Sequence, residues 1–151
     1  MTQLYFEERE ESAREELKRA DHLICVSLKY TRTCAVMMNA IKRLISAYEM
    51  AFDEYLRYAL KKKKIDELPY TFKEKGLMVR NLIGTQVTAY ISAYNKLVKI
   101  RKSAYCAIEE CRKNVTLKTD GARPIEVTVA TLEEYLGKAR EFVTLIDKLS
   151  R

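Results

Sequence analysis

The sequence predicts a mainly helical fold, an antiparallel bundle of about four helices with a small β-hairpin before the last helix. The 151 residues include only 4 Gly and 2 Pro, so few residues interrupt regular elements. Apolar residues recur at helical spacing through most of the chain, and one segment alternates with the period of two that is typical of strands. This length suits one hydrophobic core, and we assign residues 1–151 to a single domain.

The first helix is expected from Phe6 to about Lys29. Ala13, Leu17, Ala20 and Ile24 follow the alternating steps of four and three that keep side chains on one face. Its beginning is rich in glutamate, and carboxylates there favour the positive end of the helix dipole. A break is expected at residues 30–33, where threonine hydroxyls can cap the next helix.

The second helix is expected over residues 34–64 and would be roughly 45 Å long. It ends in the run Lys61–Lys64, which suits the negative end of the helix dipole. Residues 65–71 contain Pro69 and predict a loop, because the residue before a proline is steered away from the helical conformation.

A short helix is expected over residues 72–83, weakened by Gly76 and ended or bent by Gly84. A third long helix should follow from about Thr85 to at least Arg101. Two interpretations of residues 103–112 are open: this segment extends the helix, or it folds back as a separate segment.

Residues 114–128 predict the hairpin. Apolar and polar residues alternate on both sides of Asp120-Gly121, a dipeptide that favours tight turns. Pro124 indicates a free strand edge, and a two-stranded hairpin must pack on the helices or pair with another chain to be stable. The last helix opens with the capping-box spacing of Thr131 to Glu134 and continues to the end of the chain.

The net charge of +7 is unevenly distributed. Its excess lies on the two central helices and their ends, where lysine and arginine can neutralise phosphates of RNA or of another polyanion. Exposed tyrosines nearby could stack on bases, but Tyr48, Tyr55, Tyr90 and Tyr94 fall on apolar stripes and are expected in the core. A lysine run at a helix end is also often only a solvated terminus. The candidate nucleic-acid-binding residues are Lys61, Lys62, Lys63, Lys64, Lys96, Lys99, Arg101, Lys102, Arg112 and Lys113.

The four cysteines, Cys25, Cys34, Cys106 and Cys111, do not have the close spacing of zinc ligands, and the chain has one histidine. We therefore expect no metal site and no cofactor, and we expect the cysteines to be small, buried, inert thiols. Low glutamine content and abundant charge favour a thermophilic source.

The candidate catalytic groups are few. His22 is the only histidine, and its neighbour Asp21 points elsewhere on a helix, so we expect His22 to be a boundary or capping residue. Cys25 lies three residues from His22, but no phosphate-binding glycine motif is present. No apolar stretch reaches the roughly 18 residues of a membrane span, and the acidic start does not resemble a signal peptide. We expect a non-catalytic, cytoplasmic protein.

Four segments follow one another in a suggestive order: Ala-Asp-His-Leu-Ile at 20–24, Ala-Ile-Lys-Arg-Leu-Ile-Ser-Ala at 40–47, Arg-Lys-Ser at 101–103 and the closing helix at 131–140. This order resembles small archaeal proteins with a HEPN-like helical bundle. The resemblance implies a dimer that acts on RNA or accompanies a nucleotidyltransferase. Ribonuclease members carry Arg, four to six residues, then His, whereas no Arg here has a His at that distance. The resemblance thus implies a non-catalytic relative.

Together these observations predict a binding or assembly module that contacts RNA or another polyanion through the basic central helices and forms a homodimer through apolar helix surface. One alternative is a protein-binding subunit with an acidic partner, and another is a HEPN-like ribonuclease relative that lacks the Arg/His motif. The remaining alternative is an enzyme that uses His22.

Overall fold

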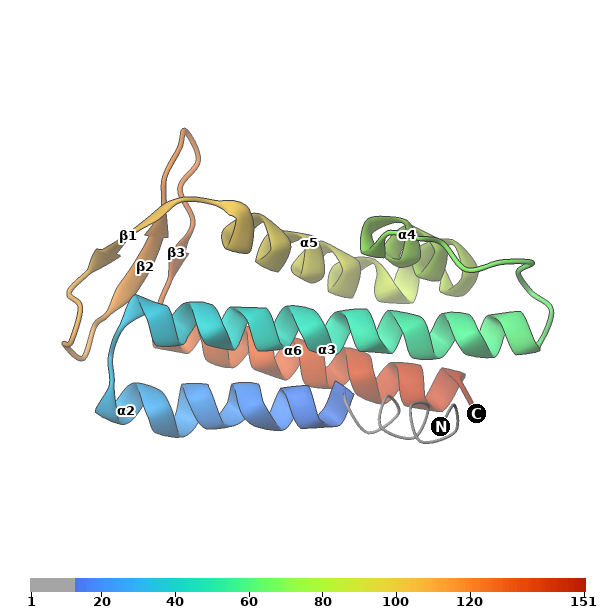
Figure 1. The fold of residues 1–151 in the computed structure, drawn as a ribbon, viewed down its shortest axis with the longest axis horizontal. Coiled ribbons are helices and arrows are strands. Elements are labelled where there is room, and N and C mark those ends of the chain that lie inside the picture. Colours follow the sequence, from blue (N-terminus) through green and yellow to red (C-terminus); the bar gives the residue numbers. More distant parts are fainter. Residues whose placement is uncertain (1–12) are drawn as a thin grey trace.

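Four long helices lie side by side in the computed structural model, which describes residues 13–151 (Figure 1). Successive long helices run in opposite directions, and a short helix lies across one side of the bundle. A three-stranded antiparallel sheet closes one end. The predicted fold class, mainly α with a small β element before the last helix, is confirmed.

The first helix covers residues 13–30 and contains one widened turn. Residues 13–22 are α-helical, Leu23–Ser27 form a π-helical turn, and α2 (Leu28–Tyr30) ends the rod. The predicted start at Phe6 lies outside the described residues. The predicted apolar face is confirmed, because Ala13, Leu17 and Ile24 are all buried.

Helix α3 (Cys34–Lys61) is the central rod, and its 28 residues span about 42 Å. The Thr33 hydroxyl caps it by accepting a hydrogen bond from the Val36 N–H at 3.4 Å. The helix ends three residues before the predicted Lys64. Lys63 adopts a left-handed conformation, and the Lys64 N–H donates to the Ala59 carbonyl at 2.8 Å, which closes a Schellman motif.

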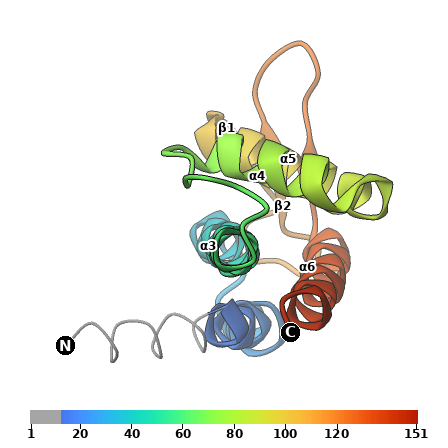
Figure 2. The same ribbon diagram turned by 90° about the vertical axis from the view of Figure 1, so that its right-hand side faces the viewer.

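Helix α4 (Phe72–Ile83) has the predicted bounds and lies across the bundle when the bundle is viewed along its axis (Figure 2). The Thr71 hydroxyl caps its start by accepting from the Glu74 N–H at 3.2 Å. Gly84, with φ of 100°, ends it in a conformation that side chains rarely adopt. A 3₁₀ turn, η2 (Thr85–Val87), then leads into α5 (Thr88–Lys102).

The sheet has the order β1-β2-β3, with β1 (Tyr105–Ile108), β2 (Thr116–Thr119) and β3 (Glu126–Val127). The predicted hairpin is confirmed as β2 and β3. Residues 103–112, for which the sequence left two readings, fold back: α5 ends at Lys102, and the chain returns as β1 beside β2. Leu117 and Val127 fix the sheet to the core, since both are fully buried.

Helix α6 (Val129–Leu149) begins earlier than predicted. Its capping box joins Thr128 and Thr131, each hydroxyl accepting from the other residue's N–H at 3.2 Å. Thr131 is therefore the third helical residue and not the cap, and the predicted pairing of Thr131 with Glu134 is wrong. A threonine can take the place usually held by Glu because its hydroxyl reaches the same backbone N–H.

An aromatic cluster fills the middle of the core. The Tyr48 ring stacks on Phe142 with centroids 5.2 Å apart, and Phe52 meets Tyr94 edge-on at 5.0 Å. The expected core positions of Tyr48, Tyr55 and Tyr94 are confirmed, since all three are buried. Tyr90 is only half-buried. None of the helices within residues 13–151 has the length and apolar character needed to cross a membrane.

Candidate nucleic-acid interface

The ten predicted basic residues are all exposed, but the fold distributes them over four places. Lys61–Lys64 lie at the carboxyl end of α3, and Arg112 and Lys113 lie in the β1–β2 loop, which is anchored at the amino end of α3. These two groups are separated by the length of α3, about 42 Å. Lys96 lies beside α6, and Lys99, Arg101 and Lys102 gather at a hollow. The predicted residues therefore do not form one continuous surface.

The hollow lies between the start of α4, the second half of α5 and the middle of α3, and it has a volume of about 580 Å³. We call it the basic hollow, because four cationic side chains and one carboxylate line it. The cations are Lys73, Lys99, Arg101 and Lys102, the carboxylate is Glu49, and the other lining residues are Thr71, Phe72, Tyr94, Asn95, Val98 and Ser103. The sequence singled out three of these cations and missed Lys73.

A hydrogen-bonded pair, the buried Tyr94 and the half-buried Glu49, belongs to the lining of the basic hollow. The Tyr94 hydroxyl donates to Glu49 Oε2 at 2.8 Å. Burial raises the pKa of Glu49, while the Tyr94 hydrogen bond and the nearby Arg101 charge lower it. Burial also raises the pKa of Tyr94, and its bond to Glu49 adds to that rise. Glu49 is thus engaged by Tyr94, and the lining keeps an excess of positive charge, with four cations against one carboxylate.

Local structure explains why cations meet here. Lys99, Arg101 and Lys102 occupy the last turn of α5, where the helix dipole favours positive charge. Lys73 lies in the first turn of α4, whose first backbone N–H groups have no acceptor within the helix. Loop 65–71 brings this turn across to α5. An anion in the hollow would therefore meet cationic side chains from both helices.

One aromatic residue, Phe72, lines the basic hollow, and another, Tyr70, lies next to the lining in the sequence. Tyr70 immediately precedes the lining residue Thr71, and its side chain is 98% exposed. Phe72 lines the hollow and is 37% exposed, and the Lys75 ammonium lies 4.4 Å from the centre of its ring. Lys75 also pairs with Asp53 at 2.8 Å, which fixes its position. Tyr70 is therefore almost fully open to solvent.

The lysine run at the end of α3 has a structural explanation of its own. Lys62, Lys63 and Lys64 make the turn that closes the helix, and their charges lie at its negative end. The Lys64 ammonium lies 5.5 Å from the centre of the Tyr58 ring. This arrangement explains the lysine run at residues 61–64 as the ordinary end of a helix.

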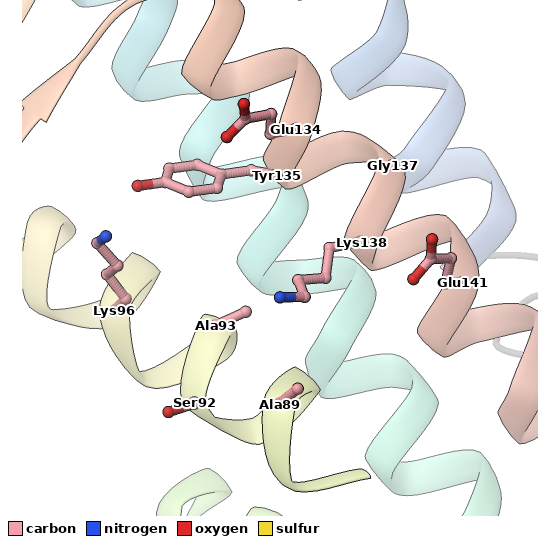
Figure 3. Close-up of a pocket in the computed structure, with 9 residues that line it drawn as sticks. All are labelled: Ala89, Ser92, Ala93, Lys96, Glu134, Tyr135, Gly137, Lys138 and Glu141. Atoms are coloured by element: carbon pink, nitrogen blue, oxygen red, sulfur yellow. The ribbon is translucent and has the colours of Figure 1, made fainter. Parts of the chain in front are cut away.

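Lys96 faces a different hollow, a groove of about 610 Å³ between α5 and α6 (Figure 3). Its ammonium lies 6.0 Å from the centre of the Tyr135 ring on α6. Ala89, Ala93 and Gly137 lie where the two helices face each other. Charges of both signs border the groove, with Lys96 and Lys138 beside Glu134 and Glu141, so it does not favour an anion.

Arg112 and Lys113 are positioned by the β1–β2 loop. The Glu110 carboxylate accepts a hydrogen bond from the Cys34 N–H at 3.0 Å, and the Cys111 N–H donates to the Arg32 carbonyl at 2.7 Å. Glu110 is exposed, and it thereby caps α3 at its positive end. The sequence could not reveal this contact, which joins residues 76 positions apart.

The cysteines differ from their prediction. Only Cys34 is buried, and its thiol lies 3.5 Å from the Thr116 carbonyl oxygen. Cys25, Cys106 and Cys111 are exposed, so the expectation of four buried thiols was wrong for three of them. Cys25 lies in the π-turn, Cys106 in the edge strand and Cys111 in the loop that follows this strand. Among residues 13–151 no group of His, Cys, Asp and Glu side chains is arranged to hold a metal ion.

His22 and its neighbours do not form a nucleophilic pair. His22 is exposed, and its Nδ1 lies 3.5 Å from the Ser27 hydroxyl. The Cys25 thiol instead donates to Asp21 Oδ1 at 3.2 Å. That hydrogen bond, together with burial and the Asp21 charge, raises the pKa of Cys25, which keeps the thiol protonated and a poor nucleophile. Asp21 pairs with Arg140 at 3.2 Å, away from the imidazole.

Comparison of the chain with protein-family models, with curated proteins and with solved structures finds no match.

Proposed function

We propose that this protein is a non-catalytic module that binds single-stranded RNA through the basic hollow. The observation that carries the proposal is the joining of Lys73, Lys99, Arg101 and Lys102 around one cavity, with Phe72 in its lining and the exposed Tyr70 directly before the lining residue Thr71. Cations along a groove and aromatic rings for stacking are the two features that sequence-tolerant binding of single strands needs.

The charges of the hollow fit a phosphate backbone. Three cations come from one turn of α5, and the fourth comes from the start of α4, so a strand crossing the hollow would meet cations on two sides. Contact with four phosphates gives a slope of about −2.8 for log affinity against log salt concentration, at roughly −0.7 for each phosphate of a single strand. This value is the expectation for a strand held by the hollow alone.

The aromatic residues fit unpaired bases. A side chain as exposed as Tyr70 gives up little protein packing when it turns toward a ligand, and it can stack on any base because every base has a π-face. Duplex RNA offers no such face to a side chain, which favours single strands over duplexes.

The test measures the affinity for a fluorescently labelled single-stranded RNA over a salt series. Neutralising two cations of the hollow, K73Q with K102Q, should make the slope shallower by about 1.4. The matched control removes the same charge at the end of α3, K61Q with K62Q, and should leave the slope unchanged. Equal effects of the two double variants would show that net charge and not the hollow governs binding.

A second pair of variants tests stacking. Tyr70→Ala should weaken binding by about 1–3 kcal/mol without changing the slope, because it removes a ring and no charge. Tyr30→Ala is the control, since Tyr30 is 85% exposed and lies at the end of the first helix. Absence of binding at low salt would overturn the proposal, and the hollow would then be tested as a docking site for an acidic protein.

A further inference from the structure

Glu49 is the one carboxylate among the lining residues of the basic hollow, and it shares this lining with four cations. It lies on α3 and is half-buried, and its Oε2 accepts the Tyr94 hydrogen bond at 2.8 Å. None of the ion pairs within residues 13–151 includes it. Asp53, one turn further along α3, differs, because Lys75 pairs with it at 2.8 Å. The charge of Glu49 therefore acts on any anion that enters the hollow.

Groups on three helices act on the protonation of Glu49. The Tyr94 hydroxyl and the Arg101 charge on α5 favour the carboxylate, and Lys75 on α4 does the same. Burial and the charge of Asp53 favour the protonated acid, and burial has the largest effect, so the pKa of Glu49 is raised above 4.5. A phosphate beside Glu49 would raise this pKa further, because it adds a second negative charge. The remaining cations of the lining are Lys73, Lys99 and Lys102.

We infer that the basic hollow takes up a proton at Glu49 when it binds RNA, so that binding tightens as the pH falls. This inference rests on the proposed function and adds regulation by pH to the same site. Protonation removes the negative charge of the lining and leaves all four cations, because lysine and arginine stay charged at neutral and mildly acidic pH. The coupling is reciprocal: RNA binds more tightly to the protonated form, and bound RNA strengthens the binding of that proton.

Tyr94 sets the pH at which this change occurs. Its hydroxyl donates to the carboxylate of Glu49 at 2.8 Å, and this bond stabilises the charged form. A protonated Glu49 still offers a carbonyl oxygen to the same hydroxyl, so protonation does not force the two side chains apart. The glutamine in Glu49→Gln keeps such an oxygen as well, and this substitution therefore imitates the protonated acid.

The test compares the affinities of the native chain and of Glu49→Gln for labelled oligouridine, at constant salt, from about pH 5 to about pH 8. Oligouridine is the probe because neither uracil nor the phosphodiester titrates appreciably in this interval. The native chain should bind about tenfold more tightly at the acid end, the order expected for one repulsive charge close to a phosphate. Glu49→Gln should bind about tenfold more tightly than the native chain near pH 8, and its affinity should vary little with pH.

Glu141→Gln is the matched control. Glu141 also accepts a tyrosine hydrogen bond, from Tyr90 at 3.2 Å, but it lines the groove between α5 and α6. The substitution changes the net charge by the same amount, so this variant should keep the pH dependence of the native chain. Tyr94→Phe should also keep a pH dependence, with its midpoint at higher pH, because the carboxylate of Glu49 loses a stabilising hydrogen bond.

A second measurement follows Glu49 itself. Carbon NMR of the glutamate side chains gives the midpoint of its titration, and its signal is the one that Glu49→Gln lacks. Bound oligouridine should move this midpoint to higher pH. The inference alone is overturned if RNA binds but the native chain and Glu49→Gln respond equally to pH, or if the midpoint does not move. Absence of RNA binding at every pH would overturn the proposed function, and this inference with it.

Discussion

Two neighbouring tyrosines of the core should respond in opposite ways to loss of a hydroxyl group. The Tyr48 hydroxyl is buried without a hydrogen-bond partner, and burial raises the pKa of Tyr48. The Tyr94 hydroxyl donates to the half-buried Glu49 at 2.8 Å. The rings are 5.8 Å apart, so they share one packing environment, and the substitution Tyr→Phe keeps both rings.

The expected magnitudes follow from these partners. A buried polar group without a partner costs about 1–3 kcal/mol, so Tyr48→Phe should raise the free energy of unfolding by about 1 kcal/mol. A hydrogen bond to a charged group contributes about 1.5–3 kcal/mol, and Tyr94→Phe should lower the same free energy by about 1.5 kcal/mol. The lower end of this range of hydrogen-bond energies applies because Glu49 keeps partial contact with solvent.

Urea denaturation followed by circular dichroism measures both changes. With an m-value of about 2 kcal/mol per M, the midpoint should rise by about 0.5 M for Tyr48→Phe and fall by about 0.8 M for Tyr94→Phe. A fall for Tyr48→Phe as large as that for Tyr94→Phe would refute the reasoning. It would mean that the Tyr48 hydroxyl has a polar partner, such as a buried water molecule.

Three further predictions concern single positions. Lys63→Gly should raise the free energy of unfolding by about 0.5–1 kcal/mol in urea, because Lys63 holds a left-handed conformation with φ of 59° that costs an L-residue about 1–2 kcal/mol. Gly137→Ala should raise the melting temperature through a gain of about 0.5–1 kcal/mol, because the added Cβ meets no atom within 4 Å apart from its chain neighbours and the adjacent backbone of α6. Burial raises the pKa of Glu49 above its ordinary value of 4.5, so the folded state holds that proton more tightly than the unfolded chain, and stability should fall as the pH rises through the interval above 4.5. Glu49→Gln should remove this decline in urea titrations at successive pH values, and an unchanged pH profile would contradict it.

The basic surface illustrates what the sequence could and could not predict about the candidate site. Lys99, Arg101 and Lys102 were recognisable as a dense local run of positive charge. Lys73 gave no such signal, because its contribution depends on α4 lying across the bundle. Conversely, Lys61–Lys64 gave the strongest signal in the sequence, and the structure explains that run as the end of a helix.

The sequence by itself determined the elements whose causes are local. Apolar spacing fixed the faces of the helices, Thr71 and Gly84 fixed both ends of α4, and Asp120-Gly121 marked where the loop of the hairpin begins. Each of these signals acts within a few residues of the chain, where backbone conformation and side-chain capping are decided.

Only the tertiary structure decided the features that depend on distant partners. Residues 105–108 became an edge strand because β2 offered them backbone hydrogen bonds, and nothing in their own sequence predicts this partner. Glu110 became the cap of α3 across 76 positions. The cations of the basic hollow met because two helix ends with opposite dipoles came together. Such contacts arise from packing, and a pattern read along the chain does not contain them.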